Sequence, residues 1–144
     1  MEDFVPFEIA KKLKEKGFTC KYPFAMYNEL GSYCPLTTSS DYVTSESGYK
    51  YRCYYDYNDF DENDFIAPTI SQVLKWLRDE KKYHIELVGN ACGYLFIISD
   101  VPSEGGTDRY CSDYSGPNDG GTWDKYEDCV LAAIEYVLDN LISK

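Results

Sequence analysis

The C-terminal stretch carries the pattern that most restricts the fold. Apolar residues recur there at the three- and four-residue spacing of one helix face. They are Val130, Leu131, Ile134, Val137, Leu138, Leu141 and Ile142. Asp124 and Glu127 precede them with the spacing of a capping pair, so we expect the helix to begin there. A stripe of this kind is stable only when another layer covers it, and we expect a sheet to do so.

Two further segments have helical spacing. The first runs over residues 6–16 and stops at Gly17, because glycine readily adopts the left-handed conformation that ends helices. The second begins at Thr69, three residues before Gln72. That spacing is typical of a capping box, in which each of the two side chains binds a backbone N–H group at the helix start. The sequence therefore predicts three amphipathic helices.

The segment after the second helix predicts a hairpin. Residues 84–88 and 94–99 have strand-like composition and flank a stretch bounded by two glycines. We therefore expect two strands joined by a five-residue loop, 89–93. Residues 94–98 are apolar at successive positions, which predicts a central strand covered on both faces.

The segment between the first two helices predicts more strands. Residues 20–27 and 32–36 read as a second hairpin, whereas residues 37–48 are rich in Ser and Thr and read as a loop. Residues 49–57 alternate in the manner of a strand. Tyr49, Tyr51, Tyr55 and Tyr57 share one face of it with Cys53, and Tyr54 lies on the other.

The resulting order is helix, strands, helix, strands, helix. It favours an α+β fold, with an antiparallel sheet built from hairpins and packed with three helices, over a parallel doubly wound sheet. The 144 residues suit a single domain spanning 1–144. Residues 37–60 and 102–122 are expected to be loop expansions, and the second of these contains five glycines and two prolines.

The net charge of −11 excludes several partner classes. With 25 acidic against 14 basic residues, the surface repels phosphate backbones and anionic lipid, so we expect no direct nucleic-acid binding and no membrane binding. No apolar run approaches the roughly 20 residues that cross a bilayer. The N-terminus lacks the pattern of an export signal, so we expect a cytoplasmic protein.

The cysteines agree with a reducing compartment. They stand at Cys20, Cys34, Cys53, Cys92, Cys111 and Cys129, with wide, irregular spacing and no CxxC pair. We expect reduced thiols, most of them small buried core residues.

Three stretches carry a resemblance. Residues 65–78, from Phe65 to Arg78, resemble a signature of small uncharacterised proteins of Bacteroides-group gut bacteria and their phages. Residues 9–18 are similar to the first helix of those proteins, and residues 126–136 to their last. The resemblance implies an origin and an architecture, and it implies no activity.

His84 is the only histidine, and it stands two residues from Glu86 on the same side of an expected strand. A histidine beside a carboxylate can act as a general base. A small hydrolase-type enzyme using His84 and a cysteine is therefore one alternative, although no nucleophile or oxyanion donor is identified. We assign no catalytic residue.

Neither a metal nor a cofactor is expected. The acidic residues of the 56–64 run invite a calcium loop, but a loop beginning at Asp59 has Asp64 in place of the required glycine and Ile70 in place of the final glutamate. One histidine and scattered cysteines lack zinc spacing. The paired glycines of 102–122 are not followed by the Lys-Ser/Thr of a phosphate loop.

Aromatic residues are the one positive sign of function. They make up 17% of the chain, with 15 tyrosines, and Tyr and Trp commonly anchor protein interfaces. The interface candidates are Tyr49, Tyr51, Tyr54, Tyr55, Tyr57, Tyr114 and Trp123. The leading hypothesis is a small intracellular protein-interaction module of phage or mobile-element origin, which binds a protein partner or itself. A second alternative to it is an acidic decoy that imitates nucleic acid.

Overall fold

A computed structural model describes residues 4–20, 25–35, 42–44, 50–52, 61–112, 116–118 and 122–142. The helices in this part of the chain are α1 (Phe7–Glu15), α2 (Ile70–Asp79) and α3 (Tyr126–Tyr136), with a short 3-10 helix, η2 (Pro102–Glu104), and a π-helical turn, η3 (Val137–Leu141). None of them has both the length and the hydrophobicity needed to span a bilayer.

The described strands form three antiparallel sheets. The largest has the order β6-β7-β8, from β6 (Tyr83–Asn90), β7 (Gly93–Asp100) and β8 (Asp108–Cys111). A smaller one has the order β2-β1-β5, from β1 (Ala25–Tyr27), β2 (Tyr33–Pro35) and β5 (Phe65–Ile66), and β3 (Tyr42–Thr44) pairs with β4 (Lys50–Arg52). Three helices packed with antiparallel sheets confirm the expected α+β class.

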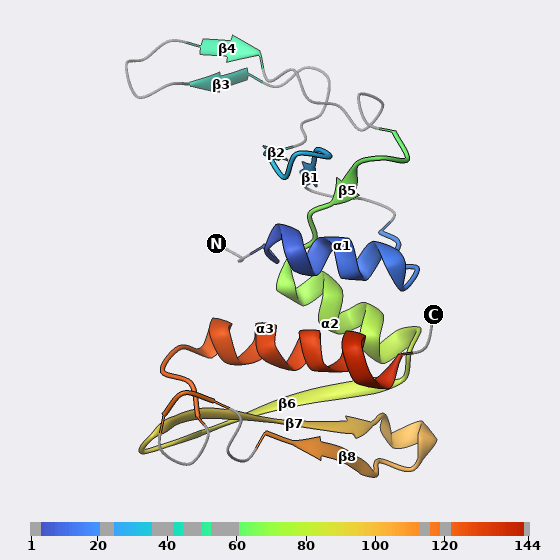
Figure 1. Ribbon diagram of the computed structural model, residues 1–144, viewed down its shortest axis with the longest axis vertical. Helices are drawn as coiled ribbons and strands as arrows, with labels where there is room; N and C mark the ends of the chain where they lie inside the picture. Colours follow the sequence, from blue (N-terminus) through green and yellow to red (C-terminus); the bar gives the residue numbers. More distant parts are fainter. Residues whose placement is uncertain are drawn as a thin grey trace.

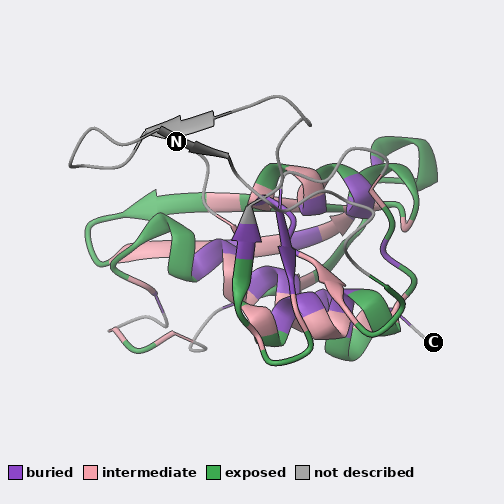
Figure 2. Cartoon of the chain, turned by 90° about the horizontal axis from the view of Figure 1, so that it is seen from above, coloured by how far each residue is buried: buried purple, intermediate pink, exposed green. Residues whose placement is uncertain are grey.

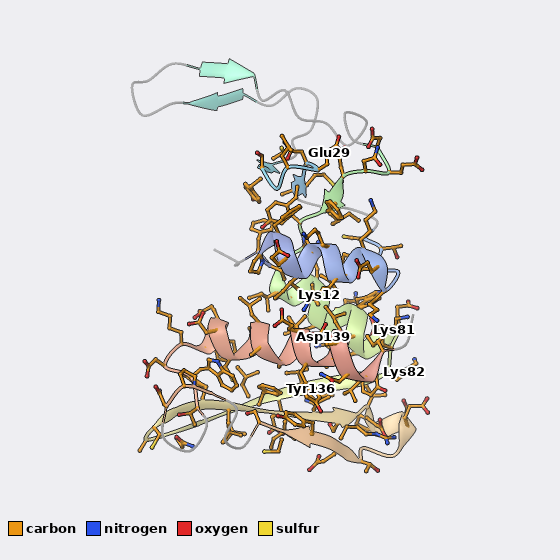
Figure 3. The ribbon with its side chains drawn as sticks, viewed as in Figure 1. Lys12, Glu29, Lys81, Lys82, Tyr136 and Asp139 are labelled. Carbon is orange, nitrogen blue, oxygen red and sulfur yellow. The ribbon has the colours of Figure 1, made fainter. Side chains whose placement is uncertain are left out.

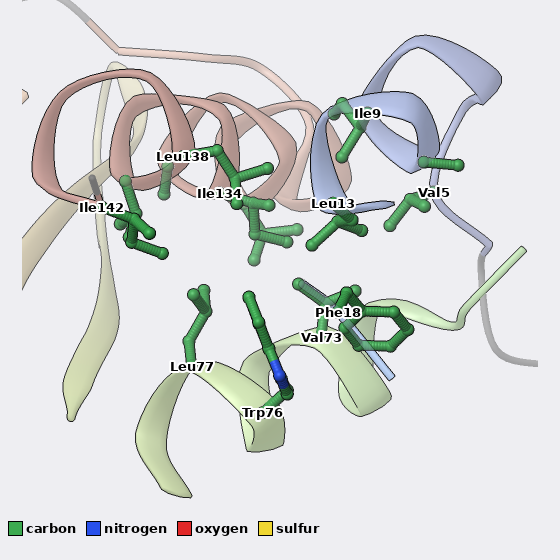
Figure 4. Packing of buried hydrophobic residues seen from close by; sticks show 14 of the residues in the cluster. Val5, Ile9, Leu13, Phe18, Val73, Trp76, Leu77, Ile134, Leu138 and Ile142 are labelled. Carbon is green, nitrogen blue, oxygen red and sulfur yellow. The ribbon is translucent and has the colours of Figure 1, made fainter. Parts of the chain in front are cut away.

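The helices lie between the two three-stranded sheets (Figure 1). Helix α3 crosses one face of the β6-β7-β8 sheet, α2 packs against both α3 and β6, and α1 contacts β5 of the smaller sheet. One apolar cluster joins all three helices, and in Figure 4 side chains from each point into the same space. Viewed from above, the buried segments gather in the middle of the molecule (Figure 2).

The predicted end of α1 and the predicted start of α2 are confirmed. Gly17 has φ +86°, and the N–H of Phe18 donates to the carbonyl of Leu13, which closes the end of α1. At the start of α2, the N–H of Gln72 donates to Thr69 Oγ1 over 3.1 Å, and the N–H of Thr69 donates to Gln72 Oε1 over 2.9 Å. The capping box is therefore complete.

The predicted start of α3 is wrong by one residue. The N-cap is Lys125, which makes no side-chain cap, and Glu127 lies inside the first turn. Asp124 Oδ1 instead accepts a 2.6 Å hydrogen bond from Asn118 Nδ2. The Asp124 side chain is thus tied to the preceding loop, one residue before the N-cap.

The far end of α3 widens into the π-helical turn η3. There the N–H of Ile142 donates to the carbonyl of Val137, five residues earlier, over 3.1 Å. This turn keeps Val137, Leu138 and Ile142 buried together with Ile134. The apolar stripe thus covers the sheet as expected, but by way of a local departure from α-helical geometry.

Lys12 ties α1 to the end of α3. Its ammonium lies 3.0 Å from Asp139 Oδ2 and 3.2 Å from Glu135 Oε2 (Figure 3). The hydrogen bond to Asp139, more than any other contact, raises the pKa of Lys12. The link is partly exposed, so it orients the two helices more than it stabilises them.

The strand predictions need three corrections. The β6–β7 hairpin turns through two residues, 91 and 92, and not five, because Asn90 pairs with Gly93 and the Asn90 side chain accepts the N–H of Cys92. Residues 37–48 are not wholly a loop, since they contain β3. Strand β7 is central as predicted, but the described residues cover only one of its faces, which leaves Leu95 and Ile97 half-buried. Strand β8 lies within the second expected loop expansion, 102–122.

Candidate functional site

Most of the predicted interface tyrosines lie outside the described residues. These are Tyr49, Tyr54, Tyr55, Tyr57 and Tyr114. Tyr51 lies in β4, of which only the backbone is described. Trp123 is half-buried, and its ring centre lies 5.6 Å from that of Phe96, a core residue under α3. These placements leave the tyrosine interface a prediction.

The uncovered face of the β6-β7-β8 sheet is the first candidate surface. Side chains alternate across a sheet, and Ile85, Leu87, Phe96 and Ile98 belong to the helix-covered side. Their neighbours therefore face away from the helices, and the strand register brings these together as one patch. The patch comprises His84, Glu86, Val88, Leu95, Ile97, Ser99 and Cys111. Val88 is 36% exposed although it is apolar.

Strand β6 is also an edge of this sheet. Tyr94 exchanges two backbone hydrogen bonds with Trp123, and Ser112 binds both the N–H and the carbonyl of Phe96. The backbone polar groups of these two β7 residues therefore point away from β6. In an antiparallel pair the bonds alternate along the strand. The alternate β7 residues, Leu95 and Ile97, therefore form the hydrogen bonds to Val88 and Glu86 of β6. The backbone groups of Ile85 and Leu87 consequently project from the free edge of β6.

His84 and Glu86 lie on this face as predicted, and both are exposed. Neither side chain makes a hydrogen bond or ion pair with any described residue. The register separates Glu86 from Cys111 by the intervening Ile97 of β7. The hydrolase alternative requires a histidine and a thiol in contact, and the sheet does not bring these two together.

None of the other described cysteines makes a hydrogen bond with His84, and Cys53 lies outside the described residues. Cys20, Cys34, Cys92 and Cys129 are free thiols, and Cys34 and Cys129 are buried. Burial raises the pKa of Cys129 to about 11. Since the thiolate is the reactive form, this cysteine acts as an inert core residue.

The second candidate is a polar cleft of about 280 Å³ at one end of the same sheet. Its lining comes from the turn before β6, the end of β7, the helix η2 and strand β8. The lining residues are Lys81, Lys82, Tyr83, Asp100, Glu104 and Arg109. Three of them are cationic and two are anionic, so the cleft is locally positive in an acidic chain.

Arg109 reaches this cleft through a β-bulge. The β7–β8 register shifts between Ile98 and Ser99, which pair with Tyr110 and Asp108, so Arg109 is the extra residue. Without the shift, the alternation of side chains would place Arg109 on the face of the sheet away from the helices, whereas Tyr110 lies on the helix-covered face. The bulge re-aims the side chain, a common use of bulges near functional sites.

Asp100 holds the re-aimed arginine in place. Arg109 Nε donates to Asp100 Oδ1 over 2.9 Å, and Arg109 Nη2 donates to Asp100 Oδ2 over 2.7 Å. The Asp100 side chain is only 10% exposed, whereas that of Arg109 is 51% exposed. The hydrogen bond from Arg109 lowers the pKa of Asp100, and the same bond raises that of Arg109. The carboxylate therefore stays ionised and fixes a guanidinium that still faces solvent.

The two lysines are positioned in different ways. Lys82 has φ +65° and is the one non-glycine residue with positive φ in the described part of the chain. Its carbonyl accepts the N–H of Val101, which joins this turn to the end of β7. Lys81 Nζ lies 5.3 Å from the centre of the Trp76 ring, within cation–π range. Both lysines lie beside the end of α2 in Figure 3.

This cleft was not predicted from the sequence. Its residues are far apart along the chain, and the bulge that brings in Arg109 has no sequence pattern of its own. The one available signal was the placement of Asp100, a carboxylate at the end of an otherwise apolar strand.

The acidic run yields no metal site within the described residues. Asp61 Oδ1 accepts the N–H of Asn63, and Asp64 Oδ2 accepts the N–H of Asp61, so the carboxylates close their own turn. No group of three His, Cys, Asp or Glu side chains suited to a metal occurs in the part that the structure describes. Asp56 and Asp59 lie outside that part.

Comparisons with protein-family models, curated proteins and solved structures give no significant match. A function for the chain therefore has to be argued from its own geometry.

Proposed function

We propose that the chain is a protein-interaction module that binds a second copy of itself through the free edge of β6. The observation that carries this proposal is a long edge strand, β6, whose face away from the helices bears a histidine and a carboxylate that pair with no described residue. Proteins usually protect long edge strands, because their free backbone groups pair readily with another strand. Strand addition is a common way of forming a protein interface.

Charge selects one register for the pairing of two β6 strands. If Ile85 lies opposite Ile85 of the second copy, antiparallel geometry places His84 opposite Glu86 of the second copy. The twofold symmetry repeats this contact, so each interface contains it twice. The alternative register centred on Glu86 would place two carboxylates opposite each other, and like charges in that position are destabilising.

The same register uses the free backbone groups. Those of Ile85 and Leu87 project from the edge, so they form the new interstrand hydrogen bonds. His84 and Glu86 then belong to non-hydrogen-bonded pairs, in which facing side chains lie closest together. The dimer joins two three-stranded sheets into one continuous sheet.

Sedimentation velocity over a range of protein concentrations tests this proposal. We expect a concentration-dependent dimer. Glu86→Lys should weaken it about tenfold, because two contacts between His84 and a carboxylate are lost and each is worth about 0.2–1 kcal/mol. His84→Lys should strengthen it, and Glu29→Lys is the matched control, since Glu29 is exposed on the turn between β1 and β2.

A chain that stays monomeric into the millimolar range overturns the proposal. So does a dimer that responds equally to Glu86→Lys and to Glu29→Lys, because its interface would then lie elsewhere.

The setting of the module is part of the same proposal. The free thiols support a reducing compartment such as the cytoplasm. The resemblance of residues 9–18, 65–78 and 126–136 supports an origin in Bacteroides-group gut bacteria or their phages.

A further inference from the structure

We propose that the cleft lined by Lys81, Lys82 and Arg109 binds the phosphoryl group of a small hydroxylated organic phosphate. This site adjoins the start of β6, with which it shares Tyr83, but the proposal does not depend on self-association. The cleft volume of about 280 Å³ lies at the lower end of the range for small-molecule sites, so it suits a ligand of a few carbon atoms.

Arg109 supplies a preorganised anion-binding group. A guanidinium has five N–H donors, and Asp100 occupies one on Nε and one on Nη2. The remaining donors belong to a half-exposed group that lines the cleft. Because Asp100 already fixes the Arg109 side chain, little conformational entropy is lost when a ligand binds to it.

Lys82 carries the clearest sign that its side chain is needed. A residue with a Cβ is strained at φ +65°, and glycine would satisfy the same backbone at lower cost. The fold needs only the backbone of this residue, whose carbonyl binds Val101. The presence of a lysine there is explained if its ammonium group contacts a ligand.

The charges of the cleft match a phosphoryl group. Among the described residues, neither Lys81 nor Lys82 has an ion-pair partner, and Asp100 is already occupied by Arg109. Two lysines and a partly engaged arginine therefore face the cleft with their charge available, which favours a multiply charged oxyanion. Glu104 is the one carboxylate left to accept hydrogen bonds, and it would bind hydroxyl groups while repelling a second anion.

This local positive region is compatible with the acidity of the whole chain. The net charge of −11 opposes long polyanions such as nucleic acids, since most of their length would face acidic surface. A small phosphate compound lies within the cleft and is screened from distant charges. The chain therefore selects small phosphates over polymeric ones.

Calorimetric titration of the full chain with glycerol phosphate, inorganic phosphate and glycerol tests the site. We expect saturable binding of both phosphates and none of glycerol. Tighter binding of glycerol phosphate supports the organic ligand and the role of Glu104, whereas equal affinity assigns free phosphate as the ligand of the same site. Absence of saturable binding for both phosphates overturns the proposal.

Two variants locate the binding. Lys82→Gly removes the ammonium group and relieves the strained backbone, so the protein stays folded while phosphate affinity falls about tenfold. Lys75→Gln removes one charge from the exposed side of α2 and is the matched control, with affinity unchanged. Equal losses in the two variants would assign the binding to general electrostatics and reject the cleft.

Discussion

Gly93→Ala tests the contact that holds residues 122–123 against the β6–β7 hairpin. A Cβ at Gly93 would lie 2.3 Å from the carbonyl oxygen of Trp123 and 3.1 Å from Thr122 Oγ1. The first contact is with backbone, so a side-chain rotation cannot relieve it. The segment at Trp123 must therefore move away from the hairpin.

That movement breaks the backbone pairing between Trp123 and Tyr94 and so lowers the free energy of unfolding. Trp123 exchanges two backbone hydrogen bonds with Tyr94, at 2.8 and 2.9 Å. Losing them costs about 2 kcal/mol, at about 1 kcal/mol for each bond. Gly93 also has φ +136°, where an alanine adds about 1–2 kcal/mol of backbone strain. We expect Gly93→Ala to lower the free energy of unfolding by about 3–4 kcal/mol.

Gly17→Ala is the matched control. Gly17 also has positive φ, but a Cβ there meets no atom within 4 Å, so the alanine adds only backbone strain of about 1 kcal/mol. Urea denaturation of both variants measures the difference, for which we expect about 2 kcal/mol. Equal losses in the two variants would show that the Tyr94–Trp123 bridge contributes nothing to stability, contrary to this prediction.

Two other predictions concern the core and the cleft. Ile134 has 0% exposure, so Ile134→Asp buries an unpaired carboxylate and should cost more than about 3 kcal/mol, against about 1 kcal/mol for Ile134→Val in the same denaturation assay. The pKa of Asp100 is lowered by Arg109, so its stabilising contribution is present above the unfolded pKa of about 4 and is lost as the pH falls through the folded value. Melting temperatures of wild type and Asp100→Asn should therefore converge below about pH 4, and a constant gap at all pH values would contradict this.

Local signals in the sequence predicted local structure well. The capping box of Thr69 and Gln72 and the end of α1 at Gly17 depend on residues within one helical turn, so spacing was enough to find them. The apolar stripe of α3 likewise identified the residues that cover the sheet.

Structural features that depend on residues far apart in the sequence were not predicted. Asp124 has the right spacing for a cap, but Asn118 occupies its carboxylate, and spacing alone does not reveal that competition. The apolar run of β7 indicated burial on both faces, yet whether a layer covers the second face depends on where the rest of the chain goes. The cleft required the bulge at Arg109, which shows itself only in the pairing of β7 with β8.

The π-helical turn at Val137–Leu141 makes the end of α3 sensitive to insertions and deletions. The turn accommodates one more residue between hydrogen-bonded groups than an α-helix does. Deleting one residue from the α-helical part of α3 before this turn would rotate Ile142 by about 100° about the helix axis, away from the core. It would also displace the carbonyls of Leu141 and Ile142 from Tyr83 and Lys16, which donate hydrogen bonds to them. The number of residues between the start of α3 and Ile142 is therefore fixed by these contacts.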